Sequence, residues 1–108
     1  ALIGEGSVIM HHALVNADAS IGKGCIINTF SNIEHDAVIG NYCHISTGAM
    51  VNGNCMVGDG TFLGSQAVMV NGVSIVGGCV IAAGSMVRKN IVRKGIYSDN
   101  PAVLKIKL

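Results

Sequence analysis

The chain is short of aromatic residues, proline and charge. Its 108 residues contain no Trp, two Phe, two Tyr and one Pro, and only 12% are charged although half are hydrophobic. A compact globule usually fills its centre with rings, so this composition argues against an ordinary globular core. The apolar residues come in runs of a few, far below the roughly 20 that a membrane-spanning helix needs. We therefore expect no membrane segment.

The charge balance and the start of the chain exclude further classes. The net charge of +1 is too small for the basic footprint of a nucleic-acid-binding protein, so we expect no nucleic-acid partner. No signal peptide is visible. The chain begins with Ala1 rather than Met, inside the repeat pattern described next, and we interpret it as a fragment that lacks an upstream region.

A six-residue repeat runs through most of the chain without insertion or deletion. From Ile3 to Val87 every sixth residue is aliphatic or Met, and a small or slim residue follows four positions later in every unit but the last. The aliphatic positions are Ile3, Ile9, Val15, Ile21, Ile27, Ile33, Ile39, Ile45, Val51, Val57, Leu63, Met69, Ile75, Ile81 and Val87. This period suits neither an α-helix nor a heptad coiled coil, and is typical of a parallel β-helix. The sequence therefore predicts an all-β domain over residues 1–92.

A second period of 18 residues sets the size of one coil. The pairs Ile3-Gly4, Ile21-Gly22, Ile39-Gly40 and Val57-Gly58 recur at this spacing, so three hexads complete one coil. The fifteen hexads predict about five coils of triangular cross-section. Residues 18 apart then lie about 4.8 Å apart along the axis, the spacing of neighbouring strands.

The last sixteen residues, 93–108, break the period and form a separate C-terminal extension. They contain the single proline, Pro101, within a turn-like sequence. Beyond it, apolar Leu104, Ile106 and Leu108 alternate with lysine. This alternation predicts a short strand with one buried face.

The four cysteines fit the repeat better than a disulfide or a metal site. Cys25, Cys43, Cys55 and Cys79 all occupy the small position of the hexad, where Ala, Ser and Thr alternate with them. Cysteine there acts as a small buried hydrophobe, and no CxxC pair suggests zinc. We expect reduced thiols, which suit a cytoplasmic protein.

One corner carries a cluster suited to proton transfer. Glu34, His35 and Asp36 follow directly after Ile33. A histidine accepts a proton near neutral pH, and a carboxylate, here Asp36 or Glu34, can orient it and raise its basicity. Gly53 lies one coil on from His35, where its backbone N–H could stabilise an oxyanion. The alternative is a solvated polar corner without a role.

A second histidine, His44, follows His35 by nine residues, or half a coil. The two therefore belong to different sides of the prism and meet only across an interface between parallel prisms. A cyclic trimer would create three such grooves. The alternative is a surface histidine without a role.

Three further groups of polar residues have weaker patterns. Asn28 is a candidate ligand for a substrate, or a corner residue that binds its own backbone. Zinc through His11 and His12 is disfavoured, because the HxxxxH spacing of zinc-binding solenoid carbonic anhydrases is absent. The last group consists of Arg88, Lys89, Arg93 and Lys94. These cations could bind phosphate groups, or serve only solubility.

These motifs resemble those of a known family. The runs Ile27-Asn28-Thr29, Ile33-Glu34-His35-Asp36 and His44-Ile45-Ser46-Thr47-Gly48-Ala49, with the closing Asn100-Pro101-Ala102, are similar to sugar O-/N-acetyltransferases of the sialic acid and bacillosamine type. These belong to the hexapeptide-repeat acyltransferase superfamily. The resemblance covers essentially the whole chain. It implies a left-handed parallel β-helix, acetyl-CoA as co-substrate, no metal, and transfer to an amine or hydroxyl of a sugar or nucleotide sugar.

The resemblance also implies roles for individual residues. His35 resembles the catalytic base, and Asp36 the acidic residue, often Glu, that assists it. Asn28 resembles a residue lining the acceptor site. The positions that resemble contacts to acetyl-CoA are His44, from the adjoining chain of a homotrimer, and Ser65 and Ala83, through their backbones. Two further residues are predicted to contact acetyl-CoA. Lys89 is one of the terminal cations that could bind phosphate, and Gly53 could donate its backbone N–H to the oxyanion.

Such enzymes typically carry an N-terminal nucleotide-sugar-binding domain. No G-x-G-x-x-G stretch or βαβ pattern occurs here, so we expect this domain to be absent from the chain. Two alternatives stay open: an acetyltransferase for another small acceptor such as serine, and a non-catalytic structural or binding β-helix.

Overall fold

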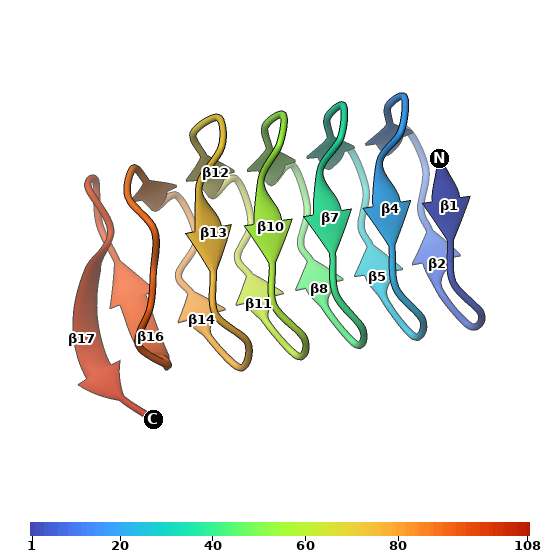
Figure 1. Ribbon diagram of the computed structural model, residues 1–108. Helices are drawn as coiled ribbons and strands as arrows, with labels where there is room; N and C mark the ends of the chain where they lie inside the picture. The colour runs from blue at the N-terminus through green and yellow to red at the C-terminus, as the bar shows by residue number, and fades with distance from the viewer.

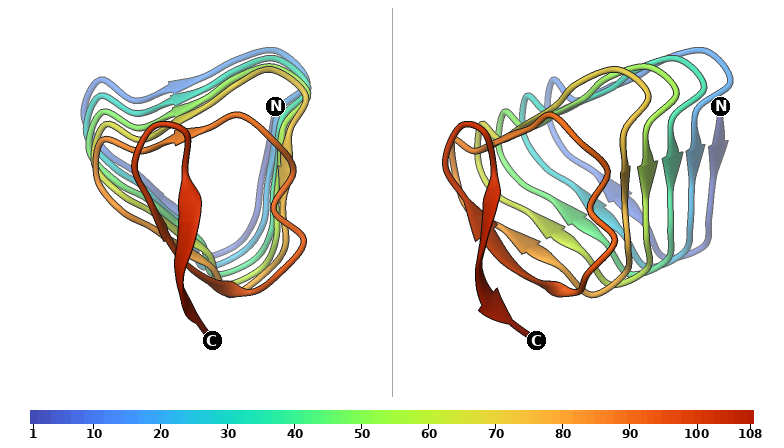
Figure 2. Two further views of the ribbon diagram at one scale, coloured as in Figure 1. Left: turned by 90° about the vertical axis from the view of Figure 1, so that its left-hand side faces the viewer. Right: turned by 60° about the vertical axis from the view of Figure 1, so that its left-hand side comes forward.

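The structure, a computed structural model, describes all 108 residues and contains strands but no helix. Short strands build a triangular prism with one sheet on each side (Figure 1 and Figure 2), and all strand pairs are parallel except the last. With the C-terminal end toward the reader, the chain runs clockwise as it approaches (Figure 2), so the coils are left-handed. The predicted all-β, left-handed parallel β-helix of about five coils is confirmed. No helix long and apolar enough to cross a membrane is present.

The three sheets take their strands in rotation along the chain. Sheet A contains β1 (Leu2–Ile3), β4 (Ser20–Ile21), β7 (Val38–Ile39), β10 (Met56–Val57) and β13 (Ser74–Ile75). Sheet B contains β2 (Val8–Ile9), β5 (Ile26–Ile27), β8 (His44–Ile45), β11 (Phe62–Leu63), β14 (Val80–Ile81), β16 (Gly95–Ser98) and β17 (Val103–Lys107). Sheet C contains β3 (Leu14–Val15), β6 (Asn32–Ile33), β9 (Met50–Val51), β12 (Val68–Met69) and β15 (Met86–Val87).

The strand register matches the 18-residue coil inferred from the sequence. Ile21 pairs with Ile39, Ile27 with Ile45, and the other hexad strands pair at the same offset. Between strands, a four-residue corner turns the chain, usually with a left-handed backbone at its third residue, as at Asp36 with φ 61°. Two corners matter below. The B/C corner comprises residues 10–13, 28–31, 46–49, 64–67 and 82–85, and the C/A corner residues 16–19, 34–37, 52–55 and 70–73.

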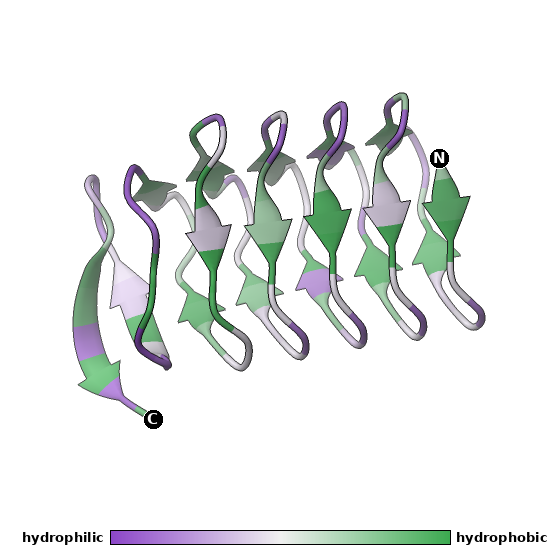
Figure 3. Cartoon of the chain, viewed as in Figure 1, coloured by the Kyte–Doolittle hydropathy of each residue, from purple (hydrophilic) through white to green (hydrophobic).

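The core is a stack of aliphatic side chains along the prism axis. In each two-residue strand the second side chain faces inward, and the small residue of each corner joins it. Twenty-three buried hydrophobic residues form one cluster. Most strands are apolar and most corners are more polar, whereas β8, which begins with His44, is drawn as a polar strand (Figure 3). At roughly 25 cal/mol per Å² of apolar surface, this burial stabilises the solenoid without a centre of aromatic rings.

All four cysteines lie at the inward small position, as the hexad predicts, and none is paired. The Sγ–H groups of Cys25 and Cys43 donate to the carbonyls of Gly40 and Gly58, at 3.0 and 3.2 Å. Burial raises the pKa of the Cys43 thiol to about 11. The thiol therefore stays protonated at neutral pH and behaves as filler rather than as a nucleophile.

The C-terminal extension continues sheet B. β16 pairs in parallel with β14, and β17 folds back antiparallel to β16. The predicted terminal strand is therefore confirmed, but its predicted buried face is wrong. Leu104 packs partly against the core, whereas Ile106 and Leu108 are 55% and 59% exposed. β17 is the edge strand of sheet B, and only its first half lies against the body of the prism.

Two buried serines provide a matched test of the core. The Ser31 hydroxyl donates to the Asn28 carbonyl at 2.7 Å, whereas the buried Ser85 hydroxyl has no hydrogen-bond partner. We predict that Ser31→Ala lowers the free energy of unfolding by about 1 kcal/mol, and that Ser85→Ala leaves it unchanged or raises it. Urea unfolding measures both values. A loss at Ser85 equal to that at Ser31 would contradict the predicted difference.

Candidate active site

The C/A corner of the second coil presents His35 and Asp36 together. β6 ends at Ile33, and the chain turns before β7. The left-handed backbone of Asp36, which aspartate tolerates better than most residues, brings its Oδ2 within 3.2 Å of His35 Nδ1. Both side chains are about half exposed, at 53% and 54%. An ionised carboxylate only accepts hydrogen bonds, so Nδ1 carries the proton and Nε2 is left free as a base.

Gly53 lies directly beneath this imidazole, as the 18-residue spacing predicts. A Cβ on Gly53 would come within 2.5 Å of His35 Nε2, so the ring occupies the space that a side chain would fill. Gly53 is itself buried, because the ring lies over the face of its Cα. Its N–H nevertheless donates no hydrogen bond within the chain. Buried amides without a partner are rare and call for an explanation.

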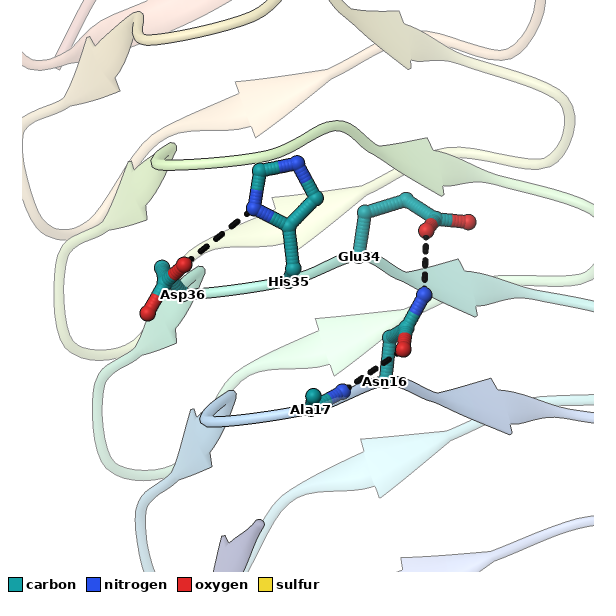
Figure 4. A network of polar contacts seen from close by, with 5 residues as sticks. All are labelled: Asn16, Ala17, Glu34, His35 and Asp36. Carbon is teal, nitrogen blue, oxygen red and sulfur yellow. Dashed lines mark hydrogen bonds and ion pairs between the residues drawn. The ribbon is translucent and has the colours of Figure 1, made fainter.

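Glu34 does not orient His35, although the sequence offered it as an alternative to Asp36. Its Oε1 accepts a hydrogen bond from Asn16 Nδ2 at 2.9 Å, and Asn16 Oδ1 accepts from the Ala17 N–H at 2.7 Å. Figure 4 shows the Glu34 carboxylate and Asp36 on opposite sides of the imidazole. Sequence reasoning missed Asn16, although its position one coil before Glu34 is a usable signal.

Asn28 and His44 form a second group away from His35. His44 is the outward residue of β8 in sheet B, and Asn28 opens the adjoining B/C corner one coil earlier. Asn28 Nδ2 and His44 Nε2 lie 3.2 Å apart. The ring of Phe62, one coil on from His44, packs edge-on at 5.1 Å between centroids. The structure therefore joins Asn28 to His44 and leaves His35 at a different corner, as the half-coil offset implied.

Ser65 and Ala83 lie one coil apart on the B/C corner. Ser65 Oγ is 3.0 Å from Ser46 Oγ, and Ala83 is exposed. The backbone N–H groups of Ser65 and Ala83 donate to no acceptor in the chain. They form a short column of unpaired donors along the prism.

His11 and His12 are exposed on the first B/C corner. The His12 ring stacks on Phe30 with 4.9 Å between centroids. No group of three or more His, Cys, Asp or Glu side chains is placed to hold a metal ion. His12 is thus part of an exposed aromatic stack, to which His11 does not contribute.

Comparison with known proteins adds a family to this geometry. The model of the bacterial transferase hexapeptide (six repeats) family matches residues 18–53 and 36–71. Together these matches span half of the chain. The chain belongs to the bacterial transferase hexapeptide family. A comparison with curated protein sequences finds no match.

Several solved structures, acetyltransferases among them, are similar to this hexapeptide transferase. The acetyltransferase domain of PglB from Neisseria gonorrhoeae, also solved with acetyl coenzyme A, is 31% identical over 96% of the chain, with TM-scores of 0.95 and 0.94. WeeI from Acinetobacter baumannii is 30% identical over 96%, with a TM-score of 0.92. PerB from Caulobacter crescentus, solved with CoA and GDP-perosamine, is 26% identical over 97%, with a TM-score of 0.81.

The chain spans only part of these relatives. It covers 51% of the PglB domain structure and of WeeI, and 58% of PerB. The similarity therefore concerns the β-helix portion of proteins that are about twice as long.

The far end of this hexapeptide transferase is strongly basic. Residues 88–108 hold six of the seven Lys and Arg residues and one Asp, whereas residues 1–87 hold one Lys and five acidic residues. A pocket of about 480 Å³ is lined by Arg88, Lys89, Asn90, Ile91, Val92, Arg93, Tyr97, Pro101, Ala102 and Val103. Arg88, Lys89 and Arg93 of this pocket form no ion pair. The one acidic residue in this part of the chain, Asp99, pairs with Lys105 instead, at 2.8 Å. This end of the prism can attract anions.

The contact between Gly53 and His35 generates a prediction. In Gly53→Ala the new methyl group displaces the imidazole and breaks its contact with Asp36. The fold is barely destabilised, because a half-exposed ring can swing into solvent. Nitrogen-15 NMR of the imidazoles should show changed His35 resonances and unchanged His44 resonances. Asn71→Ala, one coil further along the same corner, is the matched control and should change neither. Unchanged His35 resonances in Gly53→Ala would contradict the contact.

Proposed function

We propose that the chain is the acetyl-transferring domain of an enzyme that moves an acetyl group from acetyl-CoA to an amine or hydroxyl of a sugar or nucleotide sugar. The observation that carries this proposal is the His35–Asp36 pair above the unpaired amide of Gly53. The similar structures support it, because one was solved with acetyl coenzyme A and another with CoA and GDP-perosamine. An amino or hydroxyl group on a sugar is the acceptor that this comparison favours.

In the proposed reaction His35 acts as general base. Its Nε2 takes a proton from the acceptor nitrogen or oxygen as that atom attacks the thioester carbonyl carbon. Asp36 stabilises the resulting imidazolium through Nδ1–H. The Gly53 N–H donates to the oxyanion that develops on the carbonyl oxygen. The carbon–sulfur bond then breaks, and CoA leaves as a thiol after it takes the proton from His35. The thioester is already activated, so the proposal includes no metal and no covalent enzyme intermediate.

Distances along the prism support a cofactor parallel to the axis. Lys89 lies in the corner three coils on from His35, about 14 Å away at the ordinary strand spacing, although this last corner is two residues shorter because Ile91 pairs with Ile75. The pantetheine arm joins the thioester sulfur to the first phosphorus through 13 bonds, or roughly 16 Å when extended at about 1.2 Å per bond. A thioester at His35 thus brings the CoA phosphates to the basic end. The unpaired N–H groups of Ser65 and Ala83 are suited to the amide carbonyls of the arm.

We further propose that the site forms between subunits of a homotrimer. His44, Ser65 and Ala83 lie on sheet B and the B/C corner, away from His35 of the same chain. A cyclic trimer can set the B face of one prism against the C/A corner of the next. Outward side chains on sheet B support this contact, since Val8, Ile26 and Phe62 are apolar and exposed. The buried, unpaired thiols are compatible with a reducing compartment, so we place the enzyme in the cytoplasm.

Mixing two impaired variants, at an acetyl-CoA concentration too low to saturate His44→Ala, tests the shared site. His35→Ala should lower the acetylation rate by about 10²–10⁴, the usual contribution of a general base, and His44→Ala should weaken acetyl-CoA binding. Co-expressed in equal amounts, the two variants should regain roughly a quarter of the wild-type sites, because random assembly of trimers places the two intact surfaces together at that frequency. Release of CoA in the presence of a nucleotide-linked amino sugar measures the rate.

The His35→Ala/His44→Ala double variant mixed with itself is the control and should stay inactive. Light scattering establishes that the mixed protein is trimeric. A trimeric mixture without recovered activity would refute a site shared between chains, and a monomeric wild type would refute the trimer itself. A near-normal rate in His35→Ala would refute the general base.

A further inference from the structure

We infer that Asn28 is a positioning residue that fixes His44 as the neutral Nδ1–H tautomer, so that His44 offers an N–H donor to a carbonyl group of a ligand. The tautomer follows from the hydrogen bonds alone. The identity of the ligand, the carbonyl-bearing arm or thioester of acetyl-CoA, rests on the proposed function.

The orientation of the Asn28 amide is set by its own corner. Asn28 Oδ1 accepts the backbone N–H of Thr29 at 2.7 Å. Only an oxygen can accept this bond, so the other branch of the amide, Nδ2, is the nitrogen. That nitrogen lies 3.2 Å from His44 Nε2. The usual ambiguity between the two branches of an asparagine amide is thus removed by a backbone donor.

The tautomer of His44 follows from this orientation. An amide nitrogen donates hydrogen bonds and accepts none, so Nε2 must be the acceptor and carries no proton. A neutral imidazole then carries its proton on Nδ1. Asp36 produces the same tautomer at His35 by the opposite means, since it accepts from Nδ1. The two histidines are therefore prepared for different tasks: His35 leaves Nε2 free as a base, whereas His44 leaves Nδ1–H free as a donor.

The surroundings of His44 leave that donor available. His44 Nδ1 has no hydrogen-bond partner in the chain, and the residue is half-buried on the outward side of sheet B. Phe62 packs against the ring edge-on, which restricts its rotation from the next coil. A fixed, uncharged N–H donor on an apolar face suits a carbonyl oxygen. It suits a phosphate less well than the cations at the basic end do.

The 3.2 Å contact between Asn28 and His44 would also be expected if it served only to hold two coils together. One substitution distinguishes this structural role from the positioning role. Asn28→Asp keeps the shape of the side chain and the acceptor for Thr29 N–H. Its carboxylate accepts rather than donates at His44, which moves the imidazole proton to Nε2. The hydrogen bond between residue 28 and His44 survives in Asn28→Asp, but His44 loses the proton on Nδ1. His44→Asn restores an N–H donor near the Nδ1 position that does not depend on residue 28.

Nitrogen-15 NMR of the full chain without ligand tests the tautomer directly, with His44→Asn used to assign the signals. The wild type should show a protonated Nδ1 and a bare Nε2 at His44, and Asn28→Asp should show the reverse. A protonated Nε2 in the wild type, or the same tautomer in both proteins, overturns the inference. This result does not depend on catalysis, so it stands apart from the proposed function.

Calorimetric titration with acetyl-CoA then tests the use of the donor. Asn28→Asp should weaken binding about tenfold, the value of one lost hydrogen bond. In the His44→Asn background, Asn28→Asp should not weaken acetyl-CoA binding further. The N–H donor at residue 44 is then an amide that does not depend on residue 28, so the two positions are no longer energetically coupled. Equal weakening in both backgrounds overturns the positioning role. Absence of acetyl-CoA binding by the wild type would instead count against the proposed function.

Discussion

The stacking of identical coils at a fixed 18-residue offset is the constraint on which the rest of the molecule depends. Each inward aliphatic side chain rests on its equivalent in the previous coil, and parallel hydrogen bonds join the same positions. A shift of one residue would turn the inward column toward solvent. The register is therefore strongly determined, and every corner residue lies above its counterpart at the strand spacing. The corner positions therefore form a regular array, in which the neighbours of each polar side chain can be predicted from the 18-residue spacing.

This regular array of corner positions explains how a narrow prism can hold reactive groups without a deep cavity. The imidazole of His35 can lie against the next coil only because Gly53 has no side chain. The same arrangement buries an amide whose N–H has no partner, which costs free energy, of the order of 1–3 kcal/mol. Such a cost is acceptable where the group serves a ligand, and the continuous aliphatic core offsets it. Packing, backbone and candidate chemistry are thus consequences of one register.

Much of the fold could be predicted from the sequence, because the inward positions repeat without interruption. The spacing alone indicated five coils, the inward cysteines and the position of Gly53 under His35. The left-handed sense of the coils came from the family resemblance, since a repeat has no handedness of its own. The exposure of Ile106 was missed, because alternation reveals a strand but not whether another element covers it. The roles of Asn16, Asn28 and the Thr29 N–H depend on side-chain rotamers, and the repeat does not encode these.

The central claim is that acetyl-CoA lies along the C/A corner, between two prisms, with its thioester at His35. The most direct measurement is a crystal structure of the chain with acetyl-CoA bound. We predict the thioester carbonyl oxygen at about 3 Å from Gly53 N, His35 Nε2 facing the space beside the carbonyl carbon, and the phosphates near Lys89. His44 of the adjoining chain should contact the cofactor through Nδ1–H. A cofactor bound away from this corner, or held within a single chain, would contradict the account.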